Sequence, residues 1–350
     1  MADLFSSGSM LPVAAIITAL VVSAAITLII IPPLMKKMRE RGIVGLDWNK
    51  RDKVEIPELG GIAVLFAFPI GVAIATGLMK LLGTFNSAPM LGVIGVLFIS
   101  GMIGIIDDIS NLPQRIKGLV VAFAALPLIM VASGSEIIHL PFGLAPLDFS
   151  ASGQLVLMYW LLVVPLAITG SANSMNMSAG YNGLESGQVM VISLSLMGAA
   201  FFAPPTIPHI DCILIFAALF GAAAGLNYFN GYPAMVFVGD VGTLSMGAVI
   251  GAGVIIGGIQ LAGVVAIAPA FYEAFSTAYY SLIKKVNRKT AVQKPLMDDQ
   301  GKLHPPKGAE RYTLAFWVLS KRPMTERNLV RTILCIYGVF GLLAVLLTVL

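Results

Sequence analysis

The stretch "LGVIGVLFISGMIGIIDDISN", residues 91–111, decides what kind of fold this chain adopts. Residues 91–106 are all apolar or small, and they are followed at once by two neighbouring carboxylates, Asp107 and Asp108. An apolar segment of about this length suits the hydrocarbon core of a bilayer. Because charged groups are costly inside lipid, the two aspartates mark the point at which the segment leaves the membrane.

Segments of this kind recur along all 350 residues. The chain is 57% hydrophobic and 11% charged, whereas a typical soluble domain is roughly 45–50% apolar and 25% charged. This composition excludes the soluble classes and predicts an all-α integral membrane protein, a single polytopic domain over residues 1–350 with about ten transmembrane helices. The expected spans are residues 11–35, 60–82, 89–106, 118–134, 154–172, 188–203, 210–227, 241–259, 262–283 and 329–350.

The basic residues predict the orientation of these spans. If the crossings alternate, one face carries the loops at about residues 36–59, 107–117, 173–187, 228–240 and 284–328. Of the 22 Lys and Arg residues, all except Lys80 and Arg331 lie in these loops. The positive-inside rule then makes this face cytoplasmic and both termini extracytoplasmic. We expect a multi-pass protein of the cell membrane, with the endoplasmic reticulum membrane as the alternative. The opposite loop, residues 133–153, suits a short β-hairpin.

The loop "DDISNLPQRIK", residues 107–117, places acids, an amide and bases close together. Asp107 and Asp108 could chelate a hard divalent cation. Arg115 and Lys117 could hold phosphate oxygens, and Asn111 lies between the two groups. The alternative is an ordinary solvated turn between two helices.

The next loop, "NSMNMSAGYNGLESG", contributes several amides. The spacing of Asn173 and Asn176 puts both on one helical face, and Gly180 and Gly183 allow a tight turn before and after Asn182. The alternative interpretation is helix capping by Asn beside Gly. Capping accounts for one or two of these residues and leaves the others free for a site.

The stretch "NYFNGYPAMVFVGDVGTLSMG" carries Asp240, the only carboxylate between Asp211 and Glu273. Asp240 could ligate a metal while backbone N–H groups at the helix start face an anion. Alternatively, Asp240 is simply the N-cap of the following helix. Phe237 is either a packing residue or an aromatic that stacks on a base.

The first and last cytoplasmic loops carry most of the remaining charge. In "GLDWNKRDKVEIPELGG", Lys50, Arg51 and Lys53 are expected to set orientation and touch anionic lipid. Asp47, Trp48 and Glu58 are candidates for a site. The last loop, residues 284–328, is either solvated or a cationic flap over phosphates.

No loop pairs a nucleophile with a base, and the sequence has neither a Walker-type glycine loop nor a recognisable Ser-His-Asp arrangement. The two isolated cysteines exclude a disulfide framework and a structural zinc site. Metal-assisted phosphoryl transfer fits this inventory, since positioning and charge neutralisation carry that chemistry. A transporter is the competing class, but coupling-ion sites tend to lie near the bilayer midplane. A non-enzymatic scaffold leaves the metal-capable loops unexplained.

The motifs "IPELGG", "DDISNLPQRIK", "NSMNMSAGYNGLESGQ" and "NYFNGYPAMVFVGD" resemble, in this order, the signatures of the polyprenyl-phosphate N-acetylhexosamine-1-phosphate transferases. The stretches "GLDWNKRDKVEIPE" and "TERNLV" look like those of the UDP-GlcNAc:dolichyl-phosphate GlcNAc-1-phosphotransferase branch. The compact last loop is typical of an archaeal member.

The resemblance implies transfer of GlcNAc-1-phosphate from UDP-GlcNAc to a polyprenyl (dolichyl) phosphate with release of UMP, the first membrane step of N-glycan lipid-linked oligosaccharide synthesis. The alternative is the same chemistry with another UDP-N-acetylhexosamine for a cell-wall or surface polymer. The family implies a ten-span fold and requires Mg²⁺, with Mn²⁺ as a substitute. Its members act in the lipid bilayer without nucleic acid, and a homodimer is the oligomeric state that the resemblance suggests.

The resemblance also implies roles for individual residues. Asp240 and Asn176 match metal ligands, and Asp107 and Asp108 match the acidic pair that organises the metal and the lipid phosphate. Lys117 matches a lipid-phosphate contact. With Asp240, these acids and this lysine are the candidate catalytic residues. The candidate substrate-binding residues are Leu46, Asp47, Trp48, Glu58, Asn111, Arg115, Asn173, Asn182, Phe237, Arg288 and Lys289.

The last loop departs from the family pattern. The family has an Arg-His-Arg or His-rich cluster there, whereas this chain reads "NRKTAVQKP". Arg288 and Lys289, with Lys294 behind them, are therefore the candidates for the diphosphate contact.

Overall fold

The computed structural model describes residues 10–83, 85–110, 112–203, 209–284 and 294–350. Within these residues, nine helical segments are long and apolar enough to cross a membrane. They are α2 (Leu11–Glu40), α3 (Ile62–Leu82), α4 (Ala88–Ser110), the continuous run of α7 (Gly153–Met158), η2 (Tyr159–Val163) and α8 (Val164–Met177), α9 (Leu184–Phe202), α10 (His209–Asn230), α11 (Gly239–Ile256), α12 (Gln260–Ala278) and α15 (Glu326–Val349). The chain is a helical integral membrane protein, as its composition predicts.

The predicted span at residues 118–134 consists of three short consecutive helices. They are α5 (Gln114–Val120), η1 (Val121–Ala125) and α6 (Leu126–Val131). Pro127 stands in the first turn of α6 and has no N–H to donate to the preceding turn, which fits the change of helical winding at this point. This apolar run is shorter than the other nine.

Several helices continue beyond the predicted apolar spans into the polar residues. Asp107 and Asp108 belong to the last turns of α4, and Asn173 and Asn176 belong to α8. Asp240 lies in the first turn of α11. Hydropathy marks where a helix leaves lipid, whereas backbone hydrogen bonding extends the helix beyond that point. The polar side chains are therefore held on rigid helix ends.

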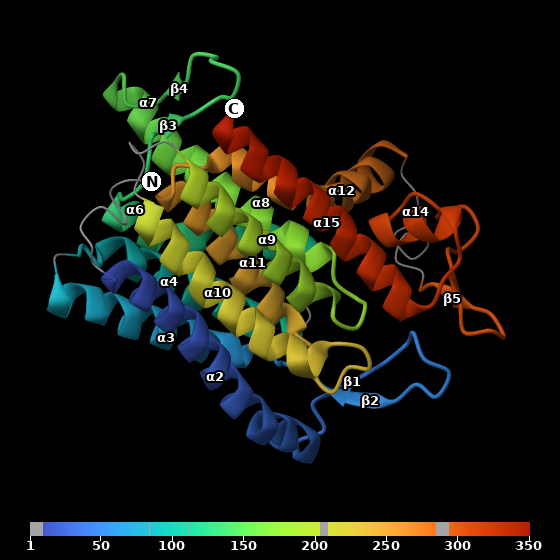
Figure 1. The fold of residues 1–350 in the computed structure, drawn as a ribbon. Helices are drawn as coiled ribbons and strands as arrows, with labels where there is room; N and C mark the ends of the chain where they lie inside the picture. The colour runs from blue at the N-terminus through green and yellow to red at the C-terminus, as the bar shows by residue number, and fades with distance from the viewer. Residues whose placement is uncertain (1–9, 84, 111, 204–208, 285–293) are drawn as a thin grey trace.

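Helix α11 forms the centre of the bundle (Figure 1). In its most apolar window 89% of the residues are buried inside the protein, against 22% for α15 and 28% for α2. Small residues allow this close packing: a Cβ on Gly247 would lie 2.7 Å from the Cα of Ala172 in α8, and a Cβ on Gly104 in α4 would lie 2.4 Å from the Cα of Val241. The helices that carry the polar ends are thus fixed against one another.

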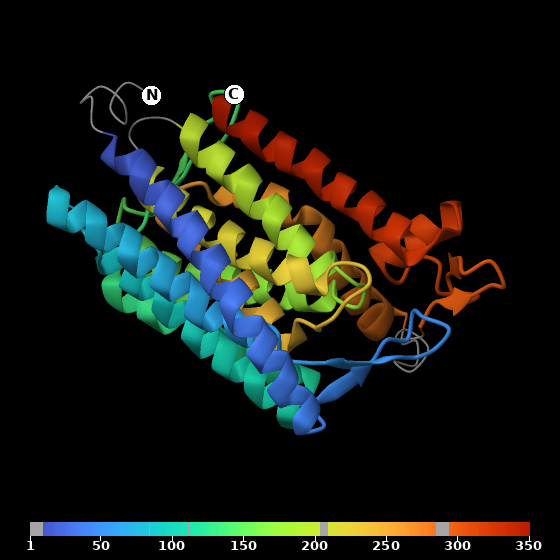
Figure 2. The same cartoon turned by 60° about the horizontal axis from the view of Figure 1, so that its bottom comes forward.

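Three short antiparallel hairpins lie at the two ends of the bundle (Figures 1 and 2). Strands β3 (Ile137–Ile138) and β4 (Leu147–Asp148) confirm the hairpin predicted within residues 133–153. At the opposite end, β1 (Val44–Leu46) pairs with β2 (Glu55–Pro57) in a register that sets Gly45 opposite Ile56. Strands β5 (Leu296–Met297) and β6 (Leu303–His304) and helix α14 (Leu314–Lys321) share that end.

Candidate active site

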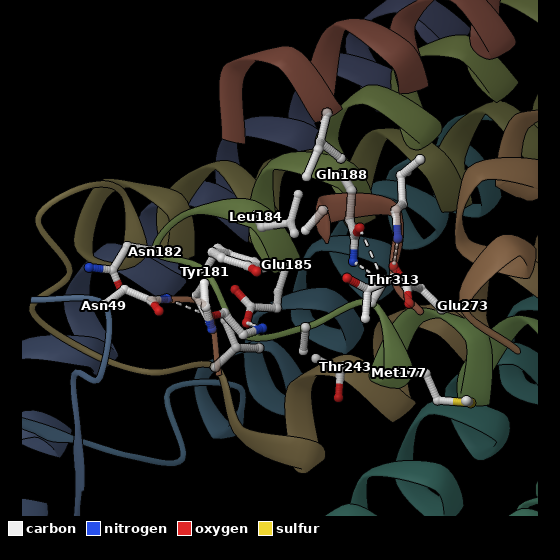
Figure 3. Close-up of a pocket in the computed structure, with 18 of the residues that line it drawn as sticks. Asn49, Met177, Tyr181, Asn182, Leu184, Glu185, Gln188, Thr243, Glu273 and Thr313 are labelled. Atoms are coloured by element: carbon white, nitrogen blue, oxygen red, sulfur yellow. Dashed lines mark hydrogen bonds between the residues drawn. The ribbon is translucent and has the colours of Figure 1, made fainter. Parts of the chain in front are cut away.

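A cavity of about 640 Å³ opens at the end of the bundle that carries β1–β2 and β5–β6. Its walls come from the β1–β2 hairpin, the α8–α9 connection, the start of α11, α12 and residues 294–316 (Figure 3). A volume of this size suits a ligand as large as a nucleotide sugar. The predicted site residues that line it are Leu46, Asp47, Trp48, Glu58, Asp108, Asn182, Phe237 and Asp240.

An ion triad lies beside the cavity. The Lys117 ammonium is 2.5 Å from Asp107 Oδ2 and 2.5 Å from Asp240 Oδ2, and the lysine is only 3% exposed. The backbone N–H of Leu112 donates to Asp107 Oδ1 at 2.7 Å. Because both carboxylates share one buried cation, removing Lys117 would leave two neighbouring negative charges without a counter-ion in a poorly solvated place. Asp240 is the member that faces the cavity.

Asp108 caps the central helix from the neighbouring helix. Its carboxylate accepts from the N–H of Asp240 at 2.8 Å and from the N–H of Val241 at 3.0 Å. The alternative that Asp240 is its own helix's N-cap is therefore wrong, because α11 begins at Gly239 and takes its capping carboxylate from α4. The anion that these N–H groups face is Asp108 itself.

Asn176 joins α8 to the start of α11. Its Nδ2 donates to Asp240 Oδ1 at 2.6 Å and to Thr243 Oγ1 at 2.8 Å. This contact replaces the capping role considered for the asparagines. The glycines do form the expected tight turn, with φ of +122° at Gly180 and +84° at Gly183.

The donor groups around Asp240 fit a hard cation. Among the described residues no group of three or more His, Cys, Asp and Glu side chains could hold a metal. Asp240, Asn176 and Thr243 nevertheless offer a carboxylate, an amide and a hydroxyl, and Asn176 can present its oxygen by turning its amide. Mg²⁺ uses one or two carboxylates and completes its shell with water and substrate phosphates. This sparse oxygen set matches that preference.

Asp47 and Asn182 both line the cavity and are bonded to each other. Asn182 Nδ2 donates to Asp47 Oδ2 at 2.9 Å, and the N–H of Asn49 donates to Asp47 Oδ1 at 3.3 Å. The buried Asp47 carboxylate is thus committed to protein donors. The Asp47 carboxylate orients the side-chain amide of Asn182, and the oxygen of that amide stays available to accept a hydrogen bond from a ligand.

Cationic groups gather at the cavity mouth around Trp48. Lys294 Nζ lies 3.0 Å from the centroid of the Trp48 ring, and Lys53 Nζ lies 5.1 Å from it. Desolvation and the neighbouring Lys53 lower the pKa of Lys294. Arg51 donates to the carbonyl of Asp299. The first and last loops therefore meet at the mouth.

Glu58 and Phe237 are held by neighbouring backbone. Phe237 donates its N–H to the Pro57 carbonyl at 2.8 Å, and its carbonyl accepts from the Gly60 N–H at 2.8 Å. Burial, together with the nearby Asp240 carboxylate, raises the pKa of Glu58. A Cβ on Gly45 would lie 2.2 Å from Glu58 Oε1, so a larger residue at position 45 would displace this carboxyl.

Some predicted residues lie elsewhere. Asn173 donates to the Thr169 carbonyl of its own helix at 2.9 Å and does not line the cavity. Asn111, Arg288, Lys289 and the side chain of Arg115 lie outside the described residues. Lys50 does not serve only orientation and lipid contact, because it forms an ion pair with the buried Glu326.

Three buried side chains in or near the cavity, Glu273, Gln188 and Glu326, were not predicted from the sequence. Glu273 of α12 accepts from the N–H of Leu314 at 2.7 Å and fixes the start of α14. Gln188 hydrogen-bonds with Ser178, and both face the cavity. An acid within an apolar span is costly, so Glu273 could have been noticed on that ground. The sequence around Gln188 and Glu326 has no comparable feature that would have pointed to these two residues.

A polytopic membrane bundle with acids and amides on helix ends around a cavity, and with a buried lysine beside it, fits a membrane-embedded transferase. Residues 90–258 match the family model described as glycosyl transferase family 4, and the chain belongs to this family.

Named relatives are archaeal and bacterial. A Sulfolobus acidocaldarius protein provisionally named UDP-N-acetylglucosamine–dolichyl-phosphate N-acetylglucosaminephosphotransferase is 31% identical over 83% of this chain and 83% of its own length. A Saccharolobus solfataricus protein of the same provisional name is 34% identical over 68% of this chain and 70% of its own. The phospho-N-acetylmuramoyl-pentapeptide-transferase of Vesicomyosocius okutanii is 28% identical over 67% and 69%.

Proposed function

We propose that this protein transfers GlcNAc-1-phosphate from UDP-GlcNAc to a polyprenyl (dolichyl) phosphate and releases UMP. The observation that carries the proposal is Asp240, which lines a cavity of nucleotide-sugar size while bonded to Lys117 and Asn176. The names of the two archaeal relatives support this donor and acceptor. The bacterial relative's name supports the alternative, the same transfer from another UDP-N-acetylhexosamine.

In this reaction an oxygen of the lipid phosphate attacks the β-phosphorus of UDP-GlcNAc. The bond from that phosphorus to the UMP oxygen breaks, and UMP leaves with the electron pair. A phosphate monoester has a second pKa near ~6, so the attacking oxygen is already ionised at neutral pH and needs no strong base. The acidic pair is thereby free for positioning.

The chain's own residues then act by placement and charge. Asp240 and Asn176 would hold Mg²⁺, or Mn²⁺ in its place, and this ion would supply charge neutralisation on the diphosphate. Lys117 would exchange part of its contact with Asp240 for an oxygen of the acceptor phosphate. Asp107 would keep Lys117 charged and in place. Asp108 would hold the start of α11, and with it Asp240, in position.

We also propose that the cavity end of the bundle is cytoplasmic and that both termini are extracytoplasmic. The predicted basic loops include the β1–β2 and β5–β6 segments, which share that end (Figure 1). The protein would then act in the cell membrane as one membrane domain, where a water-soluble donor and a lipid acceptor can meet. A homodimer stays a prediction.

The test is UMP release. Purified protein with Mg²⁺, a polyprenyl phosphate and UDP-GlcNAc should release UMP, and Asp240→Asn should lower turnover by about 100-fold or more. Asp298→Asn is the matched control, because within the described part of the chain the Asp298 carboxylate, in the β5–β6 hairpin, contacts His304 and nearby backbone. No UMP from any UDP-sugar would refute the proposal, and solute flux in liposomes would instead support a transporter.

A further inference from the structure

Glu326 is a buried carboxylate that the proposed reaction does not use. It is the first residue of α15, is 3% exposed, and is not among the residues that line the cavity. A negative charge in the first turn of a helix is favourable, but that alone requires no burial. Its contacts give a more specific reason for its position.

The Glu326 carboxylate joins three segments that are far apart in the sequence. Its Oε1 accepts from the N–H of Asn182 at 2.9 Å and from Nδ2 of Asn49 at 3.2 Å. Its Oε2 pairs with Lys50, whose ammonium also lies 3.4 Å from Asp47 Oδ2. Glu326 therefore ties the start of α15 to the β1–β2 hairpin and to the α8–α9 connection.

The same connection is held at further points. Asn49 Nδ2 also donates to the Gly180 carbonyl at 3.0 Å, and the Gly180 N–H donates to Glu185 Oε1 at 2.8 Å. Asn182 reaches across to Asp47, and both line the cavity. Glu326 holds the backbone of Asn182 while Asp47 holds its side chain.

Loss of the Glu326 carboxylate would leave the Asn182 N–H without its acceptor and Lys50 without its nearest anion. Asn182 is 3% exposed, so water cannot readily replace that acceptor. The α8–α9 connection would then shift. A displacement of about 1 Å in a ligand-binding residue is enough to weaken its contact with the ligand. Asp240 and Lys117 receive no contact from Glu326 and would stay in place.

We infer that Glu326 is a positioning residue for the part of the donor site formed by Asn182 and Asp47, an inference that rests on the proposed function. It acts through Asn182 and Asp47 and touches neither substrate. Its loss should therefore weaken the donor's binding and leave the transfer step intact.

The experiment measures kcat and KM for UDP-GlcNAc in UMP release. Glu326→Ala should raise the KM for the donor about ten-fold or more, equal to about 1.4 kcal/mol, with kcat and the KM for polyprenyl phosphate within about two-fold of wild type. Glu326→Gln keeps an oxygen that can accept from Asn182, so it should restore most of the donor affinity. Glu310→Ala is the control, because the exposed Glu310 accepts only from nearby backbone.

A loss of kcat at unchanged donor KM would overturn the inference, and so would a Glu326→Gln variant as impaired as Glu326→Ala. If Glu326→Ala does not fold, the comparison of Glu326→Gln with Glu326→Asp decides, because the shorter aspartate carboxylate is drawn away from the Asn182 N–H and should raise the donor KM more. Equal, unchanged KM values in these two variants would refute the positioning role. Wild-type protein that releases no UMP would refute the proposed function itself.

Discussion

Gly104 in α4 packs directly against the start of α11, one turn before Asp108. A Cβ at this position would lie 2.4 Å from Val241 Cα, 2.5 Å from Val241 N and 2.6 Å from the Asp240 carbonyl carbon, all backbone atoms. Ordinary van der Waals contact begins at 3.4 Å. Gly104→Ala should therefore drive the two helices apart by about 1 Å, because no side chain can move aside instead.

The separation would break the cap that Asp108 places on α11. Its hydrogen bonds of 2.8 and 3.0 Å would lengthen to about 3.8 and 4.0 Å, beyond hydrogen-bond range. Overpacking of this kind costs about 1–3 kcal/mol of stability. Because Asp240 would move relative to Lys117, turnover should fall by about 100-fold.

Two measurements test the Gly104 prediction: the rate of UMP release at saturating substrates, and thermal unfolding of the protein in detergent. Gly77→Ala is the matched control, since it adds the same methyl group to another membrane helix where nothing lies within 4 Å. A Gly104→Ala protein with the turnover and melting temperature of Gly77→Ala would refute the reasoning from helix contact.

Three further predictions concern the site. Asp107→Asn should slow turnover about ten-fold or more while changing UDP-GlcNAc binding little, because Lys117 loses a charged partner; a purely structural Asp107 would lower thermal stability without this selective loss. Gly45→Ala should displace the Glu58 carboxyl from the cavity and weaken uridine nucleotide binding, measured by calorimetry, with melting unchanged; unchanged affinity would contradict it. Chelation with EDTA should stop UMP release and added Mg²⁺ should restore it, whereas activity that survives chelation would exclude the metal proposed at Asp240.

The sequence predicted most of the membrane helices because hydropathy reports directly on lipid contact. It also predicted the cavity wall residues Asp47, Glu58 and Asp240, since polar groups between apolar spans have few other reasons to recur. The hairpin at β3–β4 followed from the length and composition of its loop.

Other features depend on contacts between distant segments and leave no local pattern. Asp108 caps a helix that begins more than a hundred residues later. The position of Asp108 next to Asp107 in the sequence therefore does not show whether its carboxylate caps a helix or binds a metal. Lys50 has the composition of a lipid-facing basic run, yet its partner Glu326 lies near the other end of the chain. The broken helix at residues 114–131 contains no charged residue after Lys117, so the sequence does not distinguish it from a continuous span, and its Pro127 alone does not fix the winding.

The first and last loops meet at the cavity mouth, although they lie near opposite ends of the chain. The family model covers residues 90–258, which contain Asp107, Lys117, Asn176 and Asp240 but neither Trp48 nor Lys294. The proposed chemical core therefore lies within the matched block, whereas the first and last loops, which flank it in the sequence, meet at the cavity mouth. A chimaera that exchanges only one of these two ends is expected to lose the contact between Lys294 and Trp48.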